Sequence, residues 1–220
     1  MLLSIIMPVY NEINNIEHII NAIKSVDISK EIIVVDDFSK DGTRDILKKI
    51  NGITLVLHDR NSGKGAAIRS GLNRVTGDYV LIQDADLEYS PHEYYKLLEP
   101  AKSMNAQVVY GSRMLGKGVF MKRSYYANRF LTFLFNILYN DRITDMETCY
   151  KLIRSDIMRG LNLISSRFEI EPEITCKLSK RKIRIIEVPI SYQGRRQGKK
   201  IGPGDGIQAV WNLLKWKFKR

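Results

Sequence analysis

The 220-residue sequence has few of the features that mark a secreted or membrane-spanning protein. Its two cysteines, Cys149 and Cys176, lie far apart and outside any metal-ligand spacing, so we expect free thiols in a reducing compartment. No stretch reaches the roughly 18 apolar residues that cross a bilayer, and the longest candidate covers residues 130–139. The chain opens with a strand-like run that has no preceding basic region or cleavage site, which predicts no signal peptide.

Two glycine motifs of nucleotide-binding proteins are also absent. No Gly-x-Gly-x-x-Gly follows the first expected strand, which disfavours an enzyme that uses a nicotinamide cofactor. The segment Asn61-Ser62-Gly63-Lys64-Gly65 departs from the Walker pattern, but it precedes an expected helix and could form a phosphate-binding loop. No internal repeat or low-complexity linker interrupts the chain, so we expect a single domain over residues 1–220.

Lysine and arginine exceed the acidic residues and give a formal net charge of +11 at pH 7. Such an excess indicates an anionic partner: nucleic acid, an acidic membrane surface or a phosphorylated substrate. A nucleic-acid-binding protein would need a base-reading element or stacking aromatics on its basic face, and the sequence offers neither. We therefore expect no nucleic acid, and composition leaves the other two partners open.

Short apolar runs alternate with amphipathic segments in the first half of the chain. The strands expected there cover residues 5–9, 31–35, 53–57 and 79–82, and the helices cover 16–23, 43–50 and 64–74. Later segments predict strands at 108–110 and 183–188, an amphipathic helix at 125–139 and a terminal helix from residue 206. Strands separated by helices are typical of βαβ units, so we predict an α/β fold with a Rossmann-like, mainly parallel sheet flanked by helices.

Acidic residues gather where three of the expected strands end. The first strand leads to Glu12, the second ends in Asp36-Asp37, and the fourth is followed by Asp84-Ala85-Asp86-Leu87-Glu88. Ligands of open α/β sheets bind at the carboxyl ends of the strands. Carboxylates that converge there repel one another unless a cation lies among them, and Mg²⁺ or Mn²⁺ bound with a nucleotide diphosphate meets that need.

The order of these motifs resembles family 2 glycosyltransferases of the GT-A fold. The resemblance is carried by Met7-Pro8-Val9-Tyr10-Asn11-Glu12, Val35 to Asp37 with Asp41-Gly42-Thr43, Asn61 to Gly65, and Asp84-Ala85-Asp86. Downstream segments are similar to the dolichol-phosphate mannose synthase branch, which transfers a sugar to a polyprenyl phosphate: Gly111-Ser112-Arg113, Thr144 to Thr148, Phe168 to Glu171, and Glu187 to Tyr192. The resemblance implies a nucleotide-sugar half at about residues 1–115 and an acceptor half at about 116–220.

The resemblance also implies roles for single residues. Those placed around the nucleoside and along the donor are Pro8, Tyr10, Glu12, Val35, Asp37, Lys64, Asp84 and Ala85. Asp37 would accept hydrogen bonds from the base. Asp86 would be the principal ligand of a divalent metal, and Glu88 the second. The catalytic set would be Asp86, Arg113 and Arg195, with Lys200 joining the arginines in neutralising the phosphates.

Three positions depart from the family pattern. Glu88 replaces the more usual Gln or Ser and adds a negative charge that favours metal binding. Cys149 takes the glycine place of an Asp-x-x-x-Gly-x-Arg pattern that spans residues 145–151. The late basic loop has Lys200-Ile201 where a Ser-Lys pair is common, which leaves Lys199 and Lys200 as alternatives for the phosphate contact.

The implied reaction is an inverting, metal-dependent transfer of a hexose, mannose or glucose, from a GDP- or UDP-linked donor to a polyprenyl phosphate. A phosphate monoester is ionised at pH 7 and needs no general base. The alternative within the family is transfer to a sugar hydroxyl of a glycan or glycolipid, with Asp145, Glu169 and Glu171 as candidate bases. A nucleotidyltransferase, from another enzyme class, would instead release pyrophosphate from a nucleoside triphosphate.

The last residues, 207–220, combine two tryptophans and a phenylalanine with four basic residues. This composition is typical of a helix that lies on an anionic membrane, and the alternative is a helix docked on the protein. A lipid-linked acceptor would account for this helix and for the apolar segment 130–139. We therefore expect a peripheral protein on the cytoplasmic face of a membrane, with a membrane-anchoring protein as a further partner of the branch.

Overall fold

The computed structural model describes residues 1–194 and 203–218, and for Lys122 and residues 203–209 it defines the backbone alone. Its central sheet has, in sheet order, β3 (Thr54–Leu57), β2 (Lys30–Asp36), β1 (Leu3–Val9), β4 (Tyr79–Ile82), β7 (Lys151–Arg154), β5 (Val108–Ser112) and β8 (Ile186–Pro189). Neighbouring strands of this sheet pair in parallel, except that β7 is antiparallel to both β4 and β5. A small parallel sheet pairs β6 (Gly118–Val119) with β9 (Tyr192–Gln193). The predicted mainly parallel α/β fold is confirmed.

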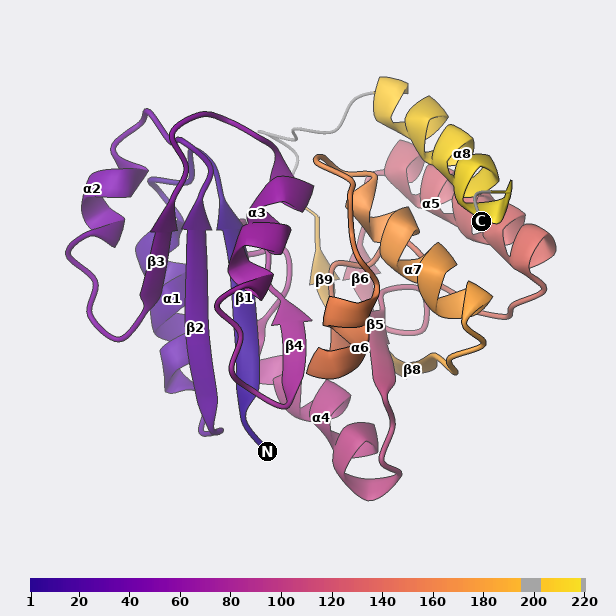
Figure 1. Cartoon of the computed structure of the whole chain (residues 1–220), viewed down its shortest axis with the longest axis horizontal. Helices are drawn as coiled ribbons and strands as arrows, with labels where there is room; N and C mark the ends of the chain where they lie inside the picture. Colours follow the sequence, from indigo (N-terminus) through magenta and orange to yellow (C-terminus); the bar gives the residue numbers. More distant parts are fainter. Residues whose placement is uncertain (195–202, 219–220) are drawn as a thin grey trace.

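Helices cover both faces of the central sheet. In Figure 1, α1 (Ile16–Ser25) lies behind the sheet and α3 (Lys64–Leu72) lies in front of it. The remaining helices are α2 (Thr43–Leu47), the 3₁₀ turn η1 (Pro91–Glu93), α4 (Tyr94–Ser103), α5 (Lys122–Tyr139), α6 (Ser155–Gly160), α7 (Ile170–Lys180) and α8 (Pro203–Phe218). The expected helices are present, although α2 ends at Leu47 and does not reach Ile50. The helices α4, α6 and α7 were not expected.

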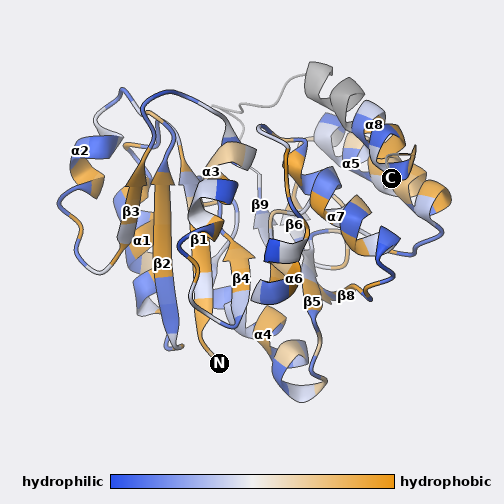
Figure 2. Cartoon of the chain, viewed as in Figure 1, coloured by the Kyte–Doolittle hydropathy of each residue, from blue (hydrophilic) through white to orange (hydrophobic). Residues whose placement is uncertain are grey.

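The core forms where the apolar pattern predicts it. The isoleucines of α1 at positions 16, 19, 20 and 23 are fully buried, because their spacing places them on one face of the helix. The middle of β1, from Ile5 to Met7, is also fully buried. Both faces of this strand are covered, so its apolar residues run without alternation. Figure 2 shows apolar residues concentrated on the central strands.

The antiparallel strand β7 joins the two halves of the sheet. It lies between β4 and β5, with Tyr79 opposite Arg154 and Tyr110 opposite Lys151. Because β7 runs against its neighbours, its first residue, Lys151, lies at the edge where β4 and β5 end. The segment that precedes Lys151 in the chain is therefore brought to the carboxyl edge of the parallel strands.

A second, smaller core holds the helices of the C-terminal part together. Leu131 and Phe135 of α5 pack there with Cys176 of α7 and with Leu213 and Trp216 of α8. Helix α8 is thus docked through its own apolar face and lies alongside α5 and α7 (Figure 1). No helix in the described part of the chain combines the length and the apolar character needed to cross a membrane.

Helix α3 makes a close backbone contact that predicts a strong effect of one methyl group. A Cβ on Gly65 would lie 2.5 Å from the carbonyl oxygen of Ser165, so the loop before α7 would have to move. We expect Gly65→Ala to lower the free energy of unfolding by about 1–3 kcal/mol despite the higher helix propensity of alanine. Urea denaturation measures the change.

Gly160→Ala is the matched control, because the added methyl would meet only the flexible end of Arg181, at 3.2 Å. Equal stabilities of the Gly65→Ala variant and the wild type would show that the contact between α3 and the loop is not tightly packed.

Candidate active site

The loops after β1, β2 and β4 meet at one edge of the sheet. The chain leaves β1 for β2 on one side and returns to β4 on the other, which makes this edge a topological switch point. Each loop contains a non-glycine residue in the left-handed region: Asn11 (φ 53°), Phe38 (φ 67°) and Leu87 (φ 62°). Each of these residues directly follows a predicted site residue. Such conformations cost roughly 1 kcal/mol each and cluster at functional sites.

Asp37 anchors the loop that leads to α3. Its Oδ1 accepts a hydrogen bond from the backbone N–H of Ser62 (2.8 Å), and its Oδ2 accepts one from Gly63 (2.7 Å). Nδ1 of His58 lies 2.8 Å from Oδ1, and the other ring nitrogen lies 2.8 Å from Oγ of Ser70. The carboxylate predicted to bind the base therefore also fixes the segment that resembles a phosphate-binding loop. No motif in the sequence indicates this role of His58.

The other residues predicted to surround the nucleoside differ in accessibility. Pro8 and Tyr10 are partly exposed near the end of β1, whereas Glu12 is 7% exposed. Val35 is fully buried in β2, and its Cγ2 would be 3.3 Å from a Cβ on Gly71 of α3. The side chain of Val35 thus packs in the core between the sheet and α3. The predicted nucleoside contacts of these residues stay predictions.

Lys64 bridges two carboxylates from different parts of the chain. Its Nζ lies 2.7 Å from Asp84 Oδ1 and 3.0 Å from Glu171 Oε1, and the fully buried Lys151 lies 2.6 Å from the other oxygen of Glu171. Burial opposes the charge on Lys64, but the carboxylates of Asp84 and Glu171 raise its pKa well above the ordinary value. Burial likewise opposes the charge on Asp84, and Lys64 lowers the pKa of that carboxyl. Lys64 therefore holds Asp84 in its charged form at the end of β4.

The loop after β4 carries the residues expected to bind a metal. Ala85 is buried, and Asp86 and Glu88 are partly exposed. Oδ1 of Asp86 accepts a hydrogen bond from the N–H of Glu88 (3.2 Å), and Oε2 of Glu88 accepts one from the hydroxyl of Tyr192 (2.5 Å). Within residues 1–194 and 203–218, no three His, Cys, Asp or Glu side chains form a metal-binding group. The donor set fits an ion held by one or two carboxylates and the phosphates of a nucleotide.

Arg113 is paired within the protein. Its Nε and Nη2 donate hydrogen bonds of 2.7 Å to the two oxygens of Asp145, and the guanidinium lies 5.1 Å from the ring centroid of Tyr192. Burial opposes its charge, but Asp145 raises the pKa of the guanidinium well above its ordinary value. The phosphate contact predicted for Arg113 stays a prediction. Arg195 and Lys200, which share that predicted role, lie outside the described residues, as does Lys199.

In the segment before β7, burial raises the pKa values of Glu147 and Cys149. Burial raises the pKa of Glu147 to about 7, while the charges of Lys151 and Arg113 act in the opposite direction. One oxygen of this carboxyl, Oε1, is buried without a hydrogen-bond partner. Cys149, in the glycine place of the family pattern, is buried, and burial raises the pKa of its thiol well above the ordinary value. It is therefore a thiol and not a thiolate at neutral pH.

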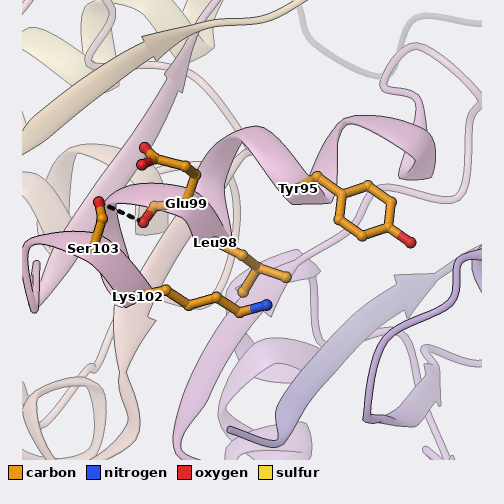
Figure 3. A pocket seen from close by; sticks show the side chains of 5 residues that line it. All are labelled: Tyr95, Leu98, Glu99, Lys102 and Ser103. Carbon is orange, nitrogen blue, oxygen red and sulfur yellow. Dashed lines mark hydrogen bonds between the residues drawn. The ribbon is translucent and has the colours of Figure 1, made fainter.

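Among the described residues, one surface groove follows the loop before α3 and another runs along α4. One, of about 690 Å³, follows the loop before α3 and is lined by His58, Arg60, Asn61, Ser62, Ala66, Arg69, Ser70, Asn73 and Ser166. The other, of about 410 Å³, runs along α4 and is lined by Tyr95, Leu98, Glu99, Lys102 and Ser103 (Figure 3). Helix α4 lies at the opposite end of the sheet from the carboxyl edge (Figure 1), so the second groove is not part of the site.

Residues 4–161 match the family described as Glycosyl transferase family 2, which is more than half of the chain. The chain belongs to glycosyltransferase family 2. The predicted family is confirmed. Three similar proteins follow, and the names of two of them include a polyprenyl phosphate.

The dolichol-phosphate mannosyltransferase of Pyrococcus furiosus is 26% identical over 99% of this chain and 65% of its own length. The low-salt glycan biosynthesis hexosyltransferase Agl6 of Haloferax volcanii is 29% identical over 88% of this chain and 48% of its own. The undecaprenyl-phosphate 4-deoxy-4-formamido-L-arabinose transferase of Edwardsiella ictaluri is 27% identical over 96% and 66%. The chain thus spans about half to two thirds of the length of these relatives.

Solved structures confirm the GT-A fold. Glucosyl-3-phosphoglycerate synthase of Mycobacterium tuberculosis, crystallised with Mn²⁺, UDP and phosphoglyceric acid, superimposes with a TM-score of 0.77. It is 21% identical, and the match covers 98% of this chain and 78% of the synthase. The same enzyme with Mg²⁺ and UDP gives a TM-score of 0.74 at 20% identity, with 97% and 78% covered.

The raised pKa of Glu147 predicts a pH dependence of stability. In the folded protein this carboxyl keeps its proton up to a pH of about 7, whereas its ordinary pKa is 4.5. The folded state binds the extra proton between these values, so the free energy of unfolding should fall as pH rises from 4.5 to 7. Glu147→Gln should remove this part of the pH dependence and stabilise the protein at pH 8 by at most about 3 kcal/mol.

Urea denaturation between pH 4.5 and 8 measures the effect. Glu99→Gln, an exposed glutamate on α4, is the control and should leave the wild-type pH profile intact. A Glu147→Gln variant with the wild-type profile would show that the buried carboxyl is ionised throughout.

Proposed function

We propose that this family 2 glycosyltransferase moves a hexose, mannose or glucose, from a nucleotide-diphosphate sugar to a polyprenyl phosphate with inversion of configuration. The observation that carries the proposal is the convergence of Asp37, Lys64 and Asp84–Asp86 on one sheet edge. The family match supports glycosyl transfer, and two relatives whose names include a polyprenyl phosphate support that acceptor. The enzyme would work as a peripheral protein on the cytoplasmic face of a membrane.

On the donor side, Asp37 would receive the base while it holds the loop before α3 in place. Asp84 would line the sugar or ribose, kept ionised and oriented by Lys64. Asp86 would be the ligand of a divalent ion, Mg²⁺ or Mn²⁺, and Glu88 a second ligand if the hydroxyl of Tyr192 yields its place. Such an ion neutralises charge that grows on the leaving diphosphate.

On the acceptor side, the charges favour a phosphate over a sugar hydroxyl. A hydroxyl needs a general base, and the three candidate carboxylates are engaged within the protein. Asp145 is bound by Arg113, Glu171 lies between Lys64 and Lys151, and Glu169 accepts hydrogen bonds from backbone N–H groups. A phosphate monoester supplies its own ionised oxygen and needs cations to approach the donor. The late basic loop from Arg195 to Lys200 would provide them.

The metal assignment predicts the effect of a single substitution. Asp86→Asn removes the charge of the principal ligand, so turnover should fall by more than about tenfold, which corresponds to roughly 1.4 kcal/mol of the activation barrier. Removal of divalent ions with a chelator should produce the same loss. Asp59→Asn, an exposed aspartate on the loop before α3, is the control. An Asp86→Asn variant that keeps more than a tenth of wild-type turnover would contradict the assignment.

The acceptor is tested with soluble substrates. The enzyme receives a short-chain prenyl phosphate, the matching prenol or a set of oligosaccharides, each with a panel of labelled GDP and UDP sugars. We expect label on the prenyl phosphate alone, lost in Arg195→Ala with donor binding only modestly weakened. Transfer to a hydroxyl of an oligosaccharide, with none to the phosphate, would place the enzyme in another branch. Glu147, whose pKa of about 7 suits a general base, would then be the first residue to substitute.

A further inference from the structure

Helix α5 presents four large apolar side chains to solvent along one line. Tyr126, Phe130, Phe133 and Ile137 are 68%, 58%, 62% and 62% exposed. At 3.6 residues per turn, these positions fall within about 60° of one another around the helix. The opposite side of α5 is buried in the second core, where Phe135 is fully covered. We call the four residues the α5 stripe.

The α5 stripe differs from the scattered apolar residues of an ordinary surface. Single exposed apolar side chains are normal, but a contiguous group of them marks a binding surface. The helix carries no acidic residue between Lys122 and Tyr139. Arg123 and Arg129 are exposed and fall on either side of the stripe, about 60° from Tyr126 in each direction. The face therefore combines apolar side chains with positive charge, which complements an anionic lipid surface.

A series of aromatic contacts connects the stripe to the candidate active site. The hydroxyl of Tyr192 binds Glu88, and the ring of Tyr192 lies 5.0 Å from that of Phe120. The ring of Phe120 lies 5.5 Å from Tyr125, which lies 5.5 Å from Tyr126 of the stripe. Packed aromatic rings therefore link the α5 stripe to the loop that carries the predicted metal ligands.

We propose that the α5 stripe is the face by which the enzyme lies on an anionic bilayer, which presents the acceptor headgroup to the site. This inference rests on the proposed function for the nature of the acceptor. The apolar side chains enter the interface between headgroups and acyl chains, and Arg123 and Arg129 contact lipid phosphates. Helix α8 has a different part: Leu213 and Trp216 are buried, and Tyr139 donates a hydrogen bond to the carbonyl of Leu213. It therefore supports α5 from the side of the second core.

The test uses vesicles of equal parts phosphatidylglycerol and phosphatidylcholine, and vesicles of phosphatidylcholine alone. The full chain should sediment with the anionic vesicles and be released as salt rises to 0.5 M, because salt screens the arginines. Phe130→Ser with Phe133→Ser should weaken binding at least tenfold, and Arg123→Gln with Arg129→Gln should remove the preference for anionic lipid. Tyr95→Ser with Met104→Ser is the control, since these side chains are 47% and 60% exposed on or beside α4.

Two further measurements separate the outcomes. The Phe130→Ser/Phe133→Ser variant should retain wild-type melting temperature and wild-type transfer to a water-soluble prenyl phosphate, and lose at least tenfold with a long-chain prenyl phosphate in vesicles. Absence of transfer to either phosphate in the wild type would refute the proposed function, while vesicle binding would still decide the role of the stripe. Wild-type vesicle binding by this variant would overturn the proposal. So would a lipid-free dimer, seen by analytical ultracentrifugation, that the two serines dissociate, because the stripe would then bind a second copy.

Discussion

The ammonium group of Lys64 is the point at which the two halves of the chain are joined chemically. It is supplied by α3 in the first half and binds Asp84 at the end of β4, and its second partner, Glu171, comes from α7 in the second half. Loss of one partner from a buried ion pair typically costs 3–5 kcal/mol. Because Lys151 binds the same glutamate, the donor edge takes its final form only when α7 and β7 are in place.

The contact between Lys64 and Asp84 is one of several that balance negative charge at the sheet edge. The acidic residues at the sheet edge form pairs with cations or donors of the protein itself: Asp36 with Arg44, Asp37 with His58, and Asp84 with Lys64. The edge is therefore not an uncompensated cluster of negative charge. A ligand that binds there must bring its own balance of charge, as a diphosphate does when it arrives with a divalent ion.

The sequence was sufficient to locate a helix or strand where one physical effect dominates its pattern. Continuous apolar runs located β1, β2 and β4, and the spacing of four isoleucines located α1. Helix α7 was not predicted because Glu171, Glu173 and Thr175 are buried. Polar residues therefore occupy part of its inward face, where an amphipathic pattern would need apolar ones. Strand β7 was not predicted because its apolar run is too short: only Leu152 and Ile153 lie between the basic residues Lys151 and Arg154.

Within the site, the sequence located the carboxylates but not their partners. The Asp84–Asp86 segment was recognised by its place after an apolar strand. The contact between Asp37 and His58 depends on tertiary packing, since the two residues belong to the ends of different strands. Likewise, no local pattern predicts the contact between Lys64 and Glu171, because the buried face of α7 is polar.

The position of β7 also determines when the sheet can be completed during synthesis. Val80 and Leu81 of β4 pair with strand β7, and residues 83–150 separate the two strands in the chain. Until β7 has been synthesised, β4 has a hydrogen-bonding edge with no neighbour, and such apolar edges readily pair with other chains. Pairing over this sequence distance is also slow. The nascent chain is therefore most prone to aggregation when it is half made, and a fragment that ends near residue 115 would keep that edge open permanently.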